Sequence, residues 1–504
     1  MTLDGSIVSA PAQKVAIVTP DGQHLSYATL RSGIARLAAA LVERGIAPGD
    51  RVAASFGNGA PIVMAFFGVA AARATFAPLN SAYTEDEFRF YLEDIGPKLL
   101  LVAPGTVPTA RAAAIALGIR VAEFALDADG MPLLDGKSLS DVVANEAVSD
   151  TDVALFLHTS GTTSRPKGVP LTHRNLTTSA LNIAKWYELG PGDVSLCVMP
   201  LFHVHGLLFS TLATLAAAAT VIIPEKFSAS SFWPTIATFG VTVVSAVPTI
   251  YRTLLLRAED DHAPKAGAHS VRFFRSSSAA LPAVEMQRLE ARFGVPVIEA
   301  YSMTEAAHQM CANPLRGERR AGSVGVGAFV GVTILDESGT EREPGEVGEV
   351  AVRGANVTSG YHNNDAANAA AFTNGWFRTG DFGVLDERGY LTLVGRLKEL
   401  INRGGEKISP VEVDEALLSH DGVIEAVAFG VPDEKYGEAV AAAVVLKPGT
   451  TVEEVRAHVA TRLAAFKVPT VIHSTDAIPK TATGKVQRRF VAAAFLPAQT
   501  QAPA

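Results

Sequence analysis

The chain has 504 residues, of which 48% are hydrophobic and 19% are charged, and its formal net charge is −8. Domains usually hold roughly 100–200 residues, so one compact core is excluded, and the low charged fraction disfavours long disordered tails. Because the balance is acidic and no block of basic residues occurs, we expect neither nucleic acid nor an anionic membrane as a partner.

The two cysteines, Cys197 and Cys311, lack the spacing of metal ligands and indicate buried free thiols in a reducing compartment. The N-terminal segment has no basic region followed by an apolar run, as a signal peptide would have. The most apolar window, residues 207–223, predicts a buried helix leading into the strand TVIIP and not a membrane span. We expect a cytoplasmic protein without a membrane partner, present as a monomer or a homodimer.

The first part of the chain alternates between helix and strand patterns. Leu30, Ile34, Leu37 and Leu41 recur at helical spacing before the strand DRVAASFG. A capping-box spacing, TEDE from residue 84, precedes a further helix and the strand KLLLVA. The same rhythm continues through TVIIP, VTVVSAVP and VRFFRSSSAAL, which predicts an α/β fold of parallel sheets covered by helices.

The pattern changes twice in the second half of the chain. Beyond about residue 320, Gly-rich segments such as VGVTILDESG and GYLTLVG predict hairpins and a small β-subdomain. After GRLKELINRGG, the segments AVAFGVPD and EAVAAAVVLKPG and a helix starting near Thr451 indicate a compact α+β unit. We place the boundary so that residues 1–397 form a large N-terminal domain and residues 398–504 a small C-terminal domain.

The loop LHTSGTTSRPKG is too polar to build a core. Gly161 and Lys167 have the separation found in a P-loop, but Pro166 precedes the lysine and Gly168 follows it, so the Walker pattern is broken. Hydroxyl groups, backbone N–H groups and two cations still favour a phosphate ligand. A mobile surface loop is the alternative.

Three further stretches offer candidate site residues. In EAYSMTEAAH, Glu305 is a candidate metal ligand and Thr304 a phosphate donor, although a Glu after a Thr is usually only a helix start. Asp381, which we expect at the end of a strand, could accept both hydroxyls of a ribose, with Arg396 beside it; singly, each is more typical of a surface salt bridge. In PKTATGKVQRR, Lys485 follows a glycine; a solvated tail is the alternative.

Together, in this order and spacing, the four stretches resemble the adenylate-forming family of acyl-CoA synthetases, firefly-type luciferases and peptide-synthetase adenylation domains. The resemblance runs from LSYATL to TGKVQRR, nearly the whole chain. It implies that a carboxylate attacks the α-phosphate of ATP, giving an acyl-adenylate and pyrophosphate. The thiol of coenzyme A then attacks the acyl carbon and AMP leaves. The implied partners are small molecules: an acid, ATP with Mg²⁺, and coenzyme A.

The same resemblance implies which residues act. Catalytic roles fall to Lys485, Glu305, Thr304 and His203, and Glu305 would hold Mg²⁺. The residues implied for ATP come from both domains and are Thr159, Ser160, Gly161, Thr162, Thr163, Lys167, Ser278, Ala279, Ala280, Glu299, Ala300, Tyr301, Ser302, Thr304, Asp381, Arg396 and Lys485. The C-terminal domain would be mobile, turning about a hinge at Lys398 to replace Lys485 with a coenzyme A site at Gly404, Gly405 and Lys407.

The acid site departs from the usual pattern of the family. The turn PLFHVHG carries His203, common beside the acyl tunnel, and His205, for which a core histidine bonded to backbone is an equal alternative. Helical spacing would put His308 on the same face as Glu305. Serine and histidine in place of an apolar tunnel favour a short polar acid, whose second carboxylate would meet His203, Ser278 and His308. Arg275 could point the same way, although a strand arginine is more often structural.

Five segments are most similar to the oxalate–CoA ligase branch of the family: HTSGTTSRPKGVPLTHRNL, PLFHVHGLL, FFRSSSAAL, EAYSMTEAAHQM and LKELINRGGEKISPVEVD. Malonate–CoA ligases share the HVHG turn and are the alternative. Three other classes stay open: a kinase or NTPase, an adenylation domain that loads a separate carrier protein, and a binder of nucleotide or coenzyme A without catalysis.

Overall fold

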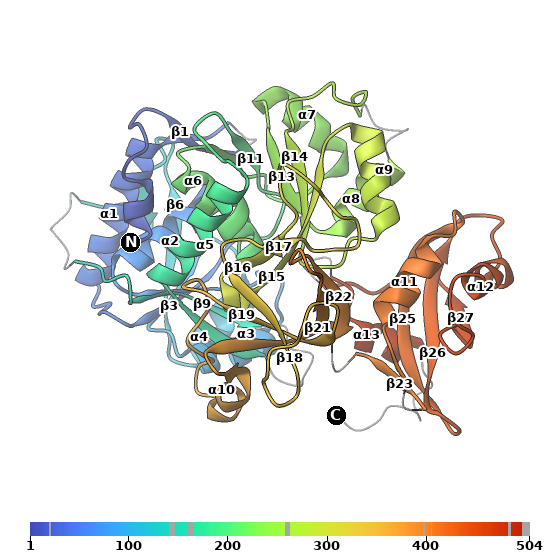
Figure 1. The fold of residues 1–504 in the computed structure, drawn as a ribbon. Coiled ribbons are helices and arrows are strands. Elements are labelled where there is room, and N and C mark those ends of the chain that lie inside the picture. The colour runs from blue at the N-terminus through green and yellow to red at the C-terminus, as the bar shows by residue number, and fades with distance from the viewer. Residues whose placement is uncertain are drawn as a thin grey trace.

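The computed structural model describes residues 1–19, 22–140, 147–159, 166–257, 263–396, 399–404, 406–481 and 485–495. Within these ranges the strands form four sheets. Two large sheets with their helices make the main body, a smaller antiparallel sheet lies beside them, and the C-terminal sheet stands at one side (Figure 1). This confirms the expected α/β fold with a β-subdomain and an α+β C-terminal unit.

The first sheet has a parallel centre and antiparallel edges. In spatial order its strands are β17 (Val326–Gly327), β16 (His308–Ala312), β15 (Val297–Met303), β14 (Phe273–Ser277), β13 (Val243–Ala246), β11 (Val194–Leu196), β12 (Thr220–Ile222), β1 (Val15–Val18) and β2 (His24–Ser26). The strands from β15 to β1 run parallel. Their carboxyl ends therefore meet at one edge of the sheet, where ligands usually bind in such folds.

The second sheet repeats this arrangement. In spatial order its strands are β10 (Lys167–Thr172), β9 (Val153–Thr159), β4 (Thr75–Pro78), β3 (Arg51–Ser55), β5 (Leu99–Val102), β6 (Arg120–Leu126), β7 (Pro132–Leu134) and β8 (Lys137–Ser138). β9 and β10 are antiparallel neighbours that pair Thr159 with Lys167, so they form the base of the predicted phosphate loop.

Helices cover both faces of the two sheets. They are α1 (Tyr27–Glu43), α2 (Ala60–Ala71), α3 (Glu85–Ile95), α4 (Pro108–Ala116), α5 (His173–Trp186), α6 (Thr214–Ala216), α7 (Ala229–Phe239), α8 (Pro248–Leu256) and α9 (Ala283–Phe293), with the 3₁₀ helix η1 (Asp4–Ile7) and the π-helix η2 (His205–Ala213). α1, α2, α5 and η2 share one hydrophobic cluster with strands of both sheets. α7 to α9 cover the far face of the first sheet, and α3 and α4 that of the second.

Alternation along the strands explains this layering. In β13, Val243 points into the cluster between the sheets and Val244 into the cluster under α7 to α9. Buried on both faces, such strands are apolar throughout, as parallel strands usually are. The predicted elements are confirmed: Leu30, Ile34 and Leu37 are buried in α1, and the capping box of α3 is present.

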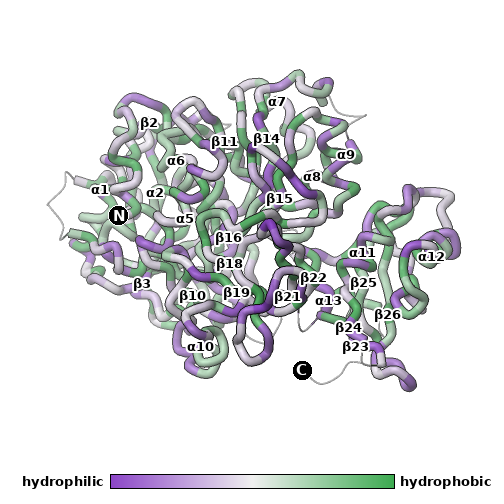
Figure 2. The backbone as a smooth tube through the Cα atoms, viewed as in Figure 1, coloured by the Kyte–Doolittle hydropathy of each residue, from purple (hydrophilic) through white to green (hydrophobic). Residues whose placement is uncertain are grey.

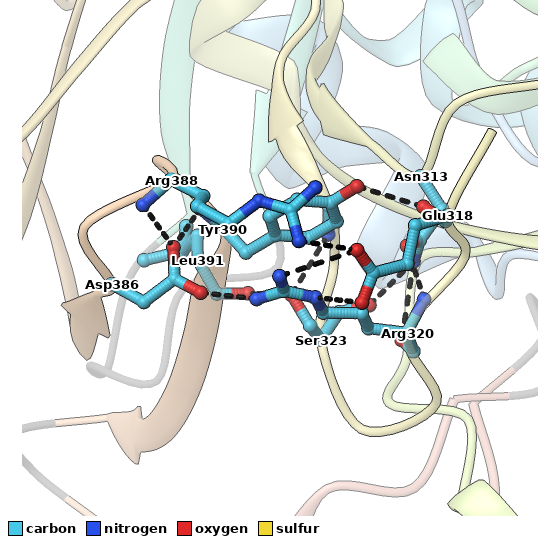
Figure 3. A network of polar contacts seen from close by, with 9 residues as sticks. Asn313, Glu318, Arg320, Ser323, Asp386, Arg388, Tyr390 and Leu391 are labelled. Carbon is cyan, nitrogen blue, oxygen red and sulfur yellow. Dashed lines mark hydrogen bonds and ion pairs between the residues drawn. The ribbon is translucent and has the colours of Figure 1, made fainter.

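The third sheet is antiparallel. Its strands are β18 (Gly331–Leu335), β19 (Val347–Arg353), β20 (Phe372–Thr373), β21 (Trp376–Leu385) and β22 (Leu391–Arg396), and the short helix α10 (Asp365–Ala371) precedes β20. The β21–β22 turn is tied to the segment before β17 by the polar network of Figure 3, in which Arg320 bonds both Glu318 and Asp386. Arg388 donates to the Glu318 carboxylate at 2.6 Å, and the Tyr390 hydroxyl donates to the Glu318 backbone carbonyl at 2.7 Å. The network fixes the hairpin that carries part of the site below.

The C-terminal sheet has its own hydrophobic core. Its strands are β23 (Ile401–Arg403), β24 (Glu406–Ile408), β25 (Val423–Asp433), β26 (Gly437–Leu446) and β27 (Val471–Ser474), with the helices α11 (Pro410–Leu418), α12 (Val452–Ala460) and α13 (Arg488–Phe495). α11 and α12 cover one face and α13 the other. Figure 2 shows hydrophobic residues along β26 and hydrophilic ones on α12. The expected domain boundary at Lys398 lies outside the described residues, so the division at that residue stays a prediction.

The C-terminal unit touches the main body. Arg288 of α9 pairs with Asp421 at 2.8 Å, and the hydroxyl of Ser409 donates to the carbonyl of Val394 in β22. Within the described ranges, no helix combines the length and the apolar character needed to span a bilayer. Both cysteines are buried free thiols, as expected, and burial raises their pKa values to about 12.

Candidate active site

The structure brings most of the predicted site residues to one place, the carboxyl edge of the first sheet. They come from the start of η2, from the turn after β14, from β15 with the 3₁₀ helix η3 (Thr304–Ala306), from the β21–β22 pair and from the segment before α13. The predicted residues Ser160, Gly161, Thr162 and Thr163 of the phosphate loop, the hinge Lys398 and Gly405 of the coenzyme A site lie outside the described residues.

Lys485 reaches the main body from the segment before α13 of the C-terminal unit. Its backbone N–H donates to the Thr481 hydroxyl at 3.1 Å, and its carbonyl accepts from the Thr481 N–H at 2.8 Å. Burial lowers the Lys485 pKa to about 8; the charge of Arg396 adds to this effect, while Glu305 and Asp381 oppose it. The ammonium group therefore lies within electrostatic reach of all three side chains, which belong to the other unit.

Asp381 is bonded from two sides. It faces Arg396 across β21 and β22, and the Arg396 Nε donates to Oδ1 at 3.0 Å. The hydroxyl of Tyr301 donates to Oδ2. The expectation that Asp381 ends a strand is wrong, because β21 continues to Leu385. Gly380, at φ +76°, lies where the register between β19 and β21 shifts, so the pairing is irregular there although the strand continues.

The end of β14 and the turn after it are bonded to β15. The Ser277 hydroxyl donates to the Ala300 carbonyl at 3.0 Å and lies 2.8 Å from the Ser302 hydroxyl. Burial raises the pKa of Glu299 to about 8, and its Oε1 accepts the Leu281 N–H at 2.9 Å. The two segments predicted to flank adenine are thus neighbours. The predicted residues Ala279 and Ala280 are exposed at the tip of this turn.

Glu305 lies beside the base of the phosphate loop. Tyr361 donates its hydroxyl to Glu305 Oε1 at 2.9 Å, and the Lys167 ammonium lies 4.4 Å from the centre of the Tyr361 ring. Burial raises the Glu305 pKa, whereas the Tyr361 hydrogen bond and the Lys167 charge act against this. Thr304 begins η3 next to it. A buried carboxylate therefore adjoins the loop for which the sequence predicts a phosphate.

The helical spacing expected between Glu305 and His308 is wrong. η3 ends at Ala306, and His308 begins the strand β16. Ala307 and His308 have φ values of +46° and +97°, a strained region for residues other than glycine. Because of this turn, His308 meets His205 of η2 from the strand β16 and not from a helix face. Ser278, at φ +72°, is a third strained residue in the same place.

Three histidines form a cluster in which His205 and His308 are fully buried and His203 is half-buried. The His203 Nδ1 accepts the His205 N–H at 3.2 Å, and the His205 and His308 rings lie 5.0 Å apart between centroids. His205 bonds Ser278 through Nδ1 at 3.0 Å and Ser245 through Nε2 at 2.7 Å, so its ring is held by serine side chains and not by backbone. Both ring nitrogens of His308 are buried without a hydrogen-bond partner among the described residues.

The histidines are neutral. Burial lowers the His203 pKa to about 3, with the Lys485 charge adding to the effect. For His205 and His308, burial and then the charge of Arg275 lower the pKa well below its ordinary value. Neutral imidazoles each have one N–H to donate. The cluster can therefore donate hydrogen bonds to an anion that Arg275 and Lys485 attract.

Arg275 is the main residue that the sequence left unassigned. It is fully buried in β14, and its guanidinium donates to Tyr187, Ser245 and Gln309 at 2.9, 3.1 and 3.2 Å. It also lies 4.6 Å from the Phe209 ring. Among the described residues, it has no carboxylate partner, so its positive charge is uncompensated.

The predicted coenzyme A residues lie elsewhere. Gly404, with φ +62°, and Lys407 are exposed on the β23–β24 hairpin, at one edge of the C-terminal sheet. The structure does not bring them to the Lys485 site. The use of two sites in turn stays a prediction.

Family models match the chain in two parts. The model described as AMP-binding enzyme matches residues 6–362, and that described as AMP-binding enzyme C-terminal domain matches residues 412–485. An oxalate–CoA ligase of Arabidopsis thaliana is 49% identical, over 98% of this chain and 99% of that protein. An oxalate–CoA ligase of Saccharomyces cerevisiae is 44% identical, over 88% of this chain and 87% of that protein.

Among solved structures, ATP-bound MatB from Rhodopseudomonas palustris is 32% identical, with a TM-score of 0.89 over 98% of this chain and 99% of that chain. Its apo form matches with a TM-score of 0.81. The whole chain is thus more similar to the ATP-bound form than to the apo form. Since the AMP-binding enzyme model covers well over half of the residues, the chain belongs to the AMP-binding enzyme family.

Proposed function

We propose that this chain joins oxalate to coenzyme A. In the first step, one oxalate carboxylate attacks the α-phosphate of ATP, forming oxalyl-adenylate and releasing pyrophosphate. In the second, the coenzyme A thiol attacks the acyl carbon, forming oxalyl-CoA and releasing AMP. The two similar oxalate–CoA ligases, each aligned along most of the chain, support this substrate.

The first step brings together two anions, and the site supplies the charge that opposes their repulsion. Two unit charges 4 Å apart repel by about 4 kcal/mol at an effective dielectric constant of 20. Lys485 lies within electrostatic reach of the histidine cluster and of Asp381, Arg396 and Glu305. In our proposal its ammonium group bridges the acid carboxylate and the α-phosphate, where charge builds up in the transition state.

The nucleotide would extend from the β14 turn to the β9–β10 loop. Adenine would lie between residues 278–280 and 299–301. Although Asp381 already accepts from Tyr301 and Arg396, a carboxylate has about four acceptor positions, so two remain for the ribose hydroxyls. Lys167 and the loop residues would hold the outer phosphates until pyrophosphate leaves.

The residues present fit a magnesium ion bound together with ATP. No cluster of three or more metal-ligating side chains occurs among the described residues, but Mg²⁺ needs only one or two carboxylates when phosphates supply the other ligands. Glu305, held by Tyr361 next to Lys167, provides one such carboxylate. When bound, the ion would neutralise phosphate charge.

In our proposal, the histidine cluster determines which acid is bound. Two buried ring nitrogens of His308 lack a partner, which costs about 1–3 kcal/mol per group unless something fills the gap. Arg275 and Lys485 supply more positive charge here than one reacting carboxylate would balance. A second carboxylate, bonded by His203, Ser278 and His308, would accept the one N–H of the neutral His308 ring and would balance the charge.

A substrate panel tests the proposal. Purified protein would be assayed with ATP, Mg²⁺, coenzyme A and, in turn, oxalate, malonate, acetate, benzoate and octanoate. We expect the highest kcat/KM for oxalate. Malonate is the main competitor because its ligases share the HVHG turn, and a higher kcat/KM for malonate would transfer the assignment to it. A preference for octanoate would contradict a polar, dianionic acid altogether.

A further inference from the structure

A continuous chain of hydrogen bonds leads from Arg275 to Ser278. The Arg275 Nη1 lies 3.1 Å from the Ser245 hydroxyl, which lies 2.7 Å from the His205 Nε2. The His205 Nδ1 in turn lies 3.0 Å from the Ser278 hydroxyl. Arg275, Ser245 and His205 are fully buried. Ser278 is only partly buried and stands at the edge of the proposed acid site.

The donors and acceptors decide the direction of this chain. A guanidinium only donates, so Arg275 donates to the Ser245 oxygen. If His205 also donated to that oxygen, the Ser245 hydrogen would have no acceptor among the described contacts, at a cost of about 1–3 kcal/mol. If Ser245 donates to His205 Nε2 instead, the Ser245 hydrogen has an acceptor. The neutral imidazole then carries its hydrogen on Nδ1 and donates it to the Ser278 oxygen.

This direction has a consequence for Ser278. Its oxygen accepts from His205, so its own hydrogen is free to point at the acid. With the other tautomer of His205, Ser278 would have to donate to Nδ1, and its hydrogen would be withheld from a substrate. Ser278 holds its place despite a strained φ of +72°, which costs about 1–3 kcal/mol. Strain of this kind is characteristic of functional positions.

We propose that Arg275 is a positioning residue, which acts through Ser245 to fix His205 in the Nδ1–H tautomer and thereby turns the Ser278 hydroxyl hydrogen toward the acid carboxylate. The inference rests on the acid site of the proposed function and adds a residue that does not touch substrate. Tyr187 and Gln309 accept from the other guanidinium nitrogens of Arg275 and keep the group in one orientation.

The tautomer can be measured without any substrate. Two-bond ¹H–¹⁵N correlation spectra of histidine-labelled full-length protein distinguish Nδ1–H from Nε2–H, and the His205→Gln variant assigns the signal. We expect Nδ1–H in the unaltered protein. In Arg275→Met and in Ser245→Ala, we expect the Nε2–H form to appear, because the donor to Nε2 is misdirected or lost.

Kinetics supply the second readout. In both variants we expect kcat/KM for oxalate to fall roughly tenfold to a hundredfold, the value of a hydrogen bond to a charged group, while KM for ATP changes less than about twofold. Tyr187→Phe is the matched control, because it removes a buried bond to the same guanidinium outside the chain to Ser278 and should leave the tautomer as it is. If Arg275→Met does not fold, Ser245→Ala alone decides.

An Nε2–H signal from His205 in the unaltered protein would overturn the inference, as would an unchanged tautomer in Ser245→Ala. An error in the proposed substrate can be told apart from an error in this inference. It would appear as a preference for another acid in the substrate panel, and the His205 tautomer of the unaltered protein would still be Nδ1–H. A shift of the tautomer together with unchanged oxalate kinetics would also refute the positioning role.

Discussion

Arg396 bonds Asp381 directly across the β21–β22 ladder, with Nε 3.0 Å from Oδ1. The pair places a carboxylate with spare acceptor positions beside the charge of Lys485. In Asp381→Asn, one acceptor oxygen and the negative charge are lost. We expect kcat/KM for ATP to fall roughly tenfold to a hundredfold, measured by ATP–pyrophosphate exchange. Unchanged ATP kinetics would remove Asp381 from the ribose site.

Replacing Lys485 should separate the two half-reactions. In Lys485→Ala we expect adenylate formation to fall by at least about a hundredfold to a thousandfold, as when a transition-state donor is removed. Formation of the CoA thioester from supplied acyl-adenylate should stay near its original rate, because a different face of the C-terminal unit would serve that step. Equal loss in both half-reactions would indicate a general structural role.

The pH dependence follows from the same lysine. A lysine is cationic below its pKa, and burial lowers the Lys485 pKa to about 8. The cation is therefore lost as the pH rises through about 8, and we expect kcat/KM for ATP to fall about tenfold per pH unit beyond it. The corresponding fall in kcat should begin at a higher pH, because the negative charge of bound ATP raises the Lys485 pKa. A profile that stays flat to pH 10 would contradict this.

Glu305 should set the magnesium requirement. In Glu305→Gln we expect the Mg²⁺ concentration for half-maximal pyrophosphate exchange to rise about tenfold or more, because a metal ligand loses its charge. Tyr361→Phe removes only the hydrogen bond that orients this carboxylate and keeps the ring beneath Lys167. Its effect should be in the same direction and within about 10–100-fold. A titration curve identical to that of the unaltered protein in Glu305→Gln would exclude the metal role.

The turn that carries His203 and His205 depends on Gly206. A Cβ at Gly206 would come within 2.6 Å of the Pro200 carbonyl oxygen, so Gly206→Ala forces the backbone apart. We expect a loss of about 1–3 kcal/mol in the free energy of unfolding, measured in urea. Gly190→Ala is the control, since a Cβ there meets no atom within 4 Å. Equal stabilities of the two variants would show that the turn tolerates the extra methyl group.

Features set by neighbouring residues could be predicted from the sequence, whereas features set by residues far apart in the chain could not. Local patterns sufficed for α1 and for the capping box at Thr84, because helix periodicity and caps depend on neighbouring residues. They failed at His308, where the strand β16 and two positive φ angles replace the expected helix. That turn is imposed by pairing of β16 with β15, which a local pattern does not contain.

The buried network around Arg275 was out of reach for a related reason. Its partners Tyr187 and Ser245 lie 88 and 30 residues away in the chain, and only the folded sheet brings them together. By contrast, Lys485, Glu305, Asp381 and Arg396 could be predicted as one site, since the resemblance to a family supplied the long-range information. The roles assigned to them remain predictions, and the structure contributes their proximity.

The central claim is that cations and neutral donors from both units allow an acid dianion to react with ATP at the α-phosphate. Product analysis tests it most directly: the protein is incubated with ATP, Mg²⁺, coenzyme A and oxalate, and nucleotides and thioesters are separated by chromatography. The account predicts AMP and oxalyl-CoA in equal amounts, with neither formed when oxalate is omitted. Formation of ADP, or of AMP without a thioester, would contradict it.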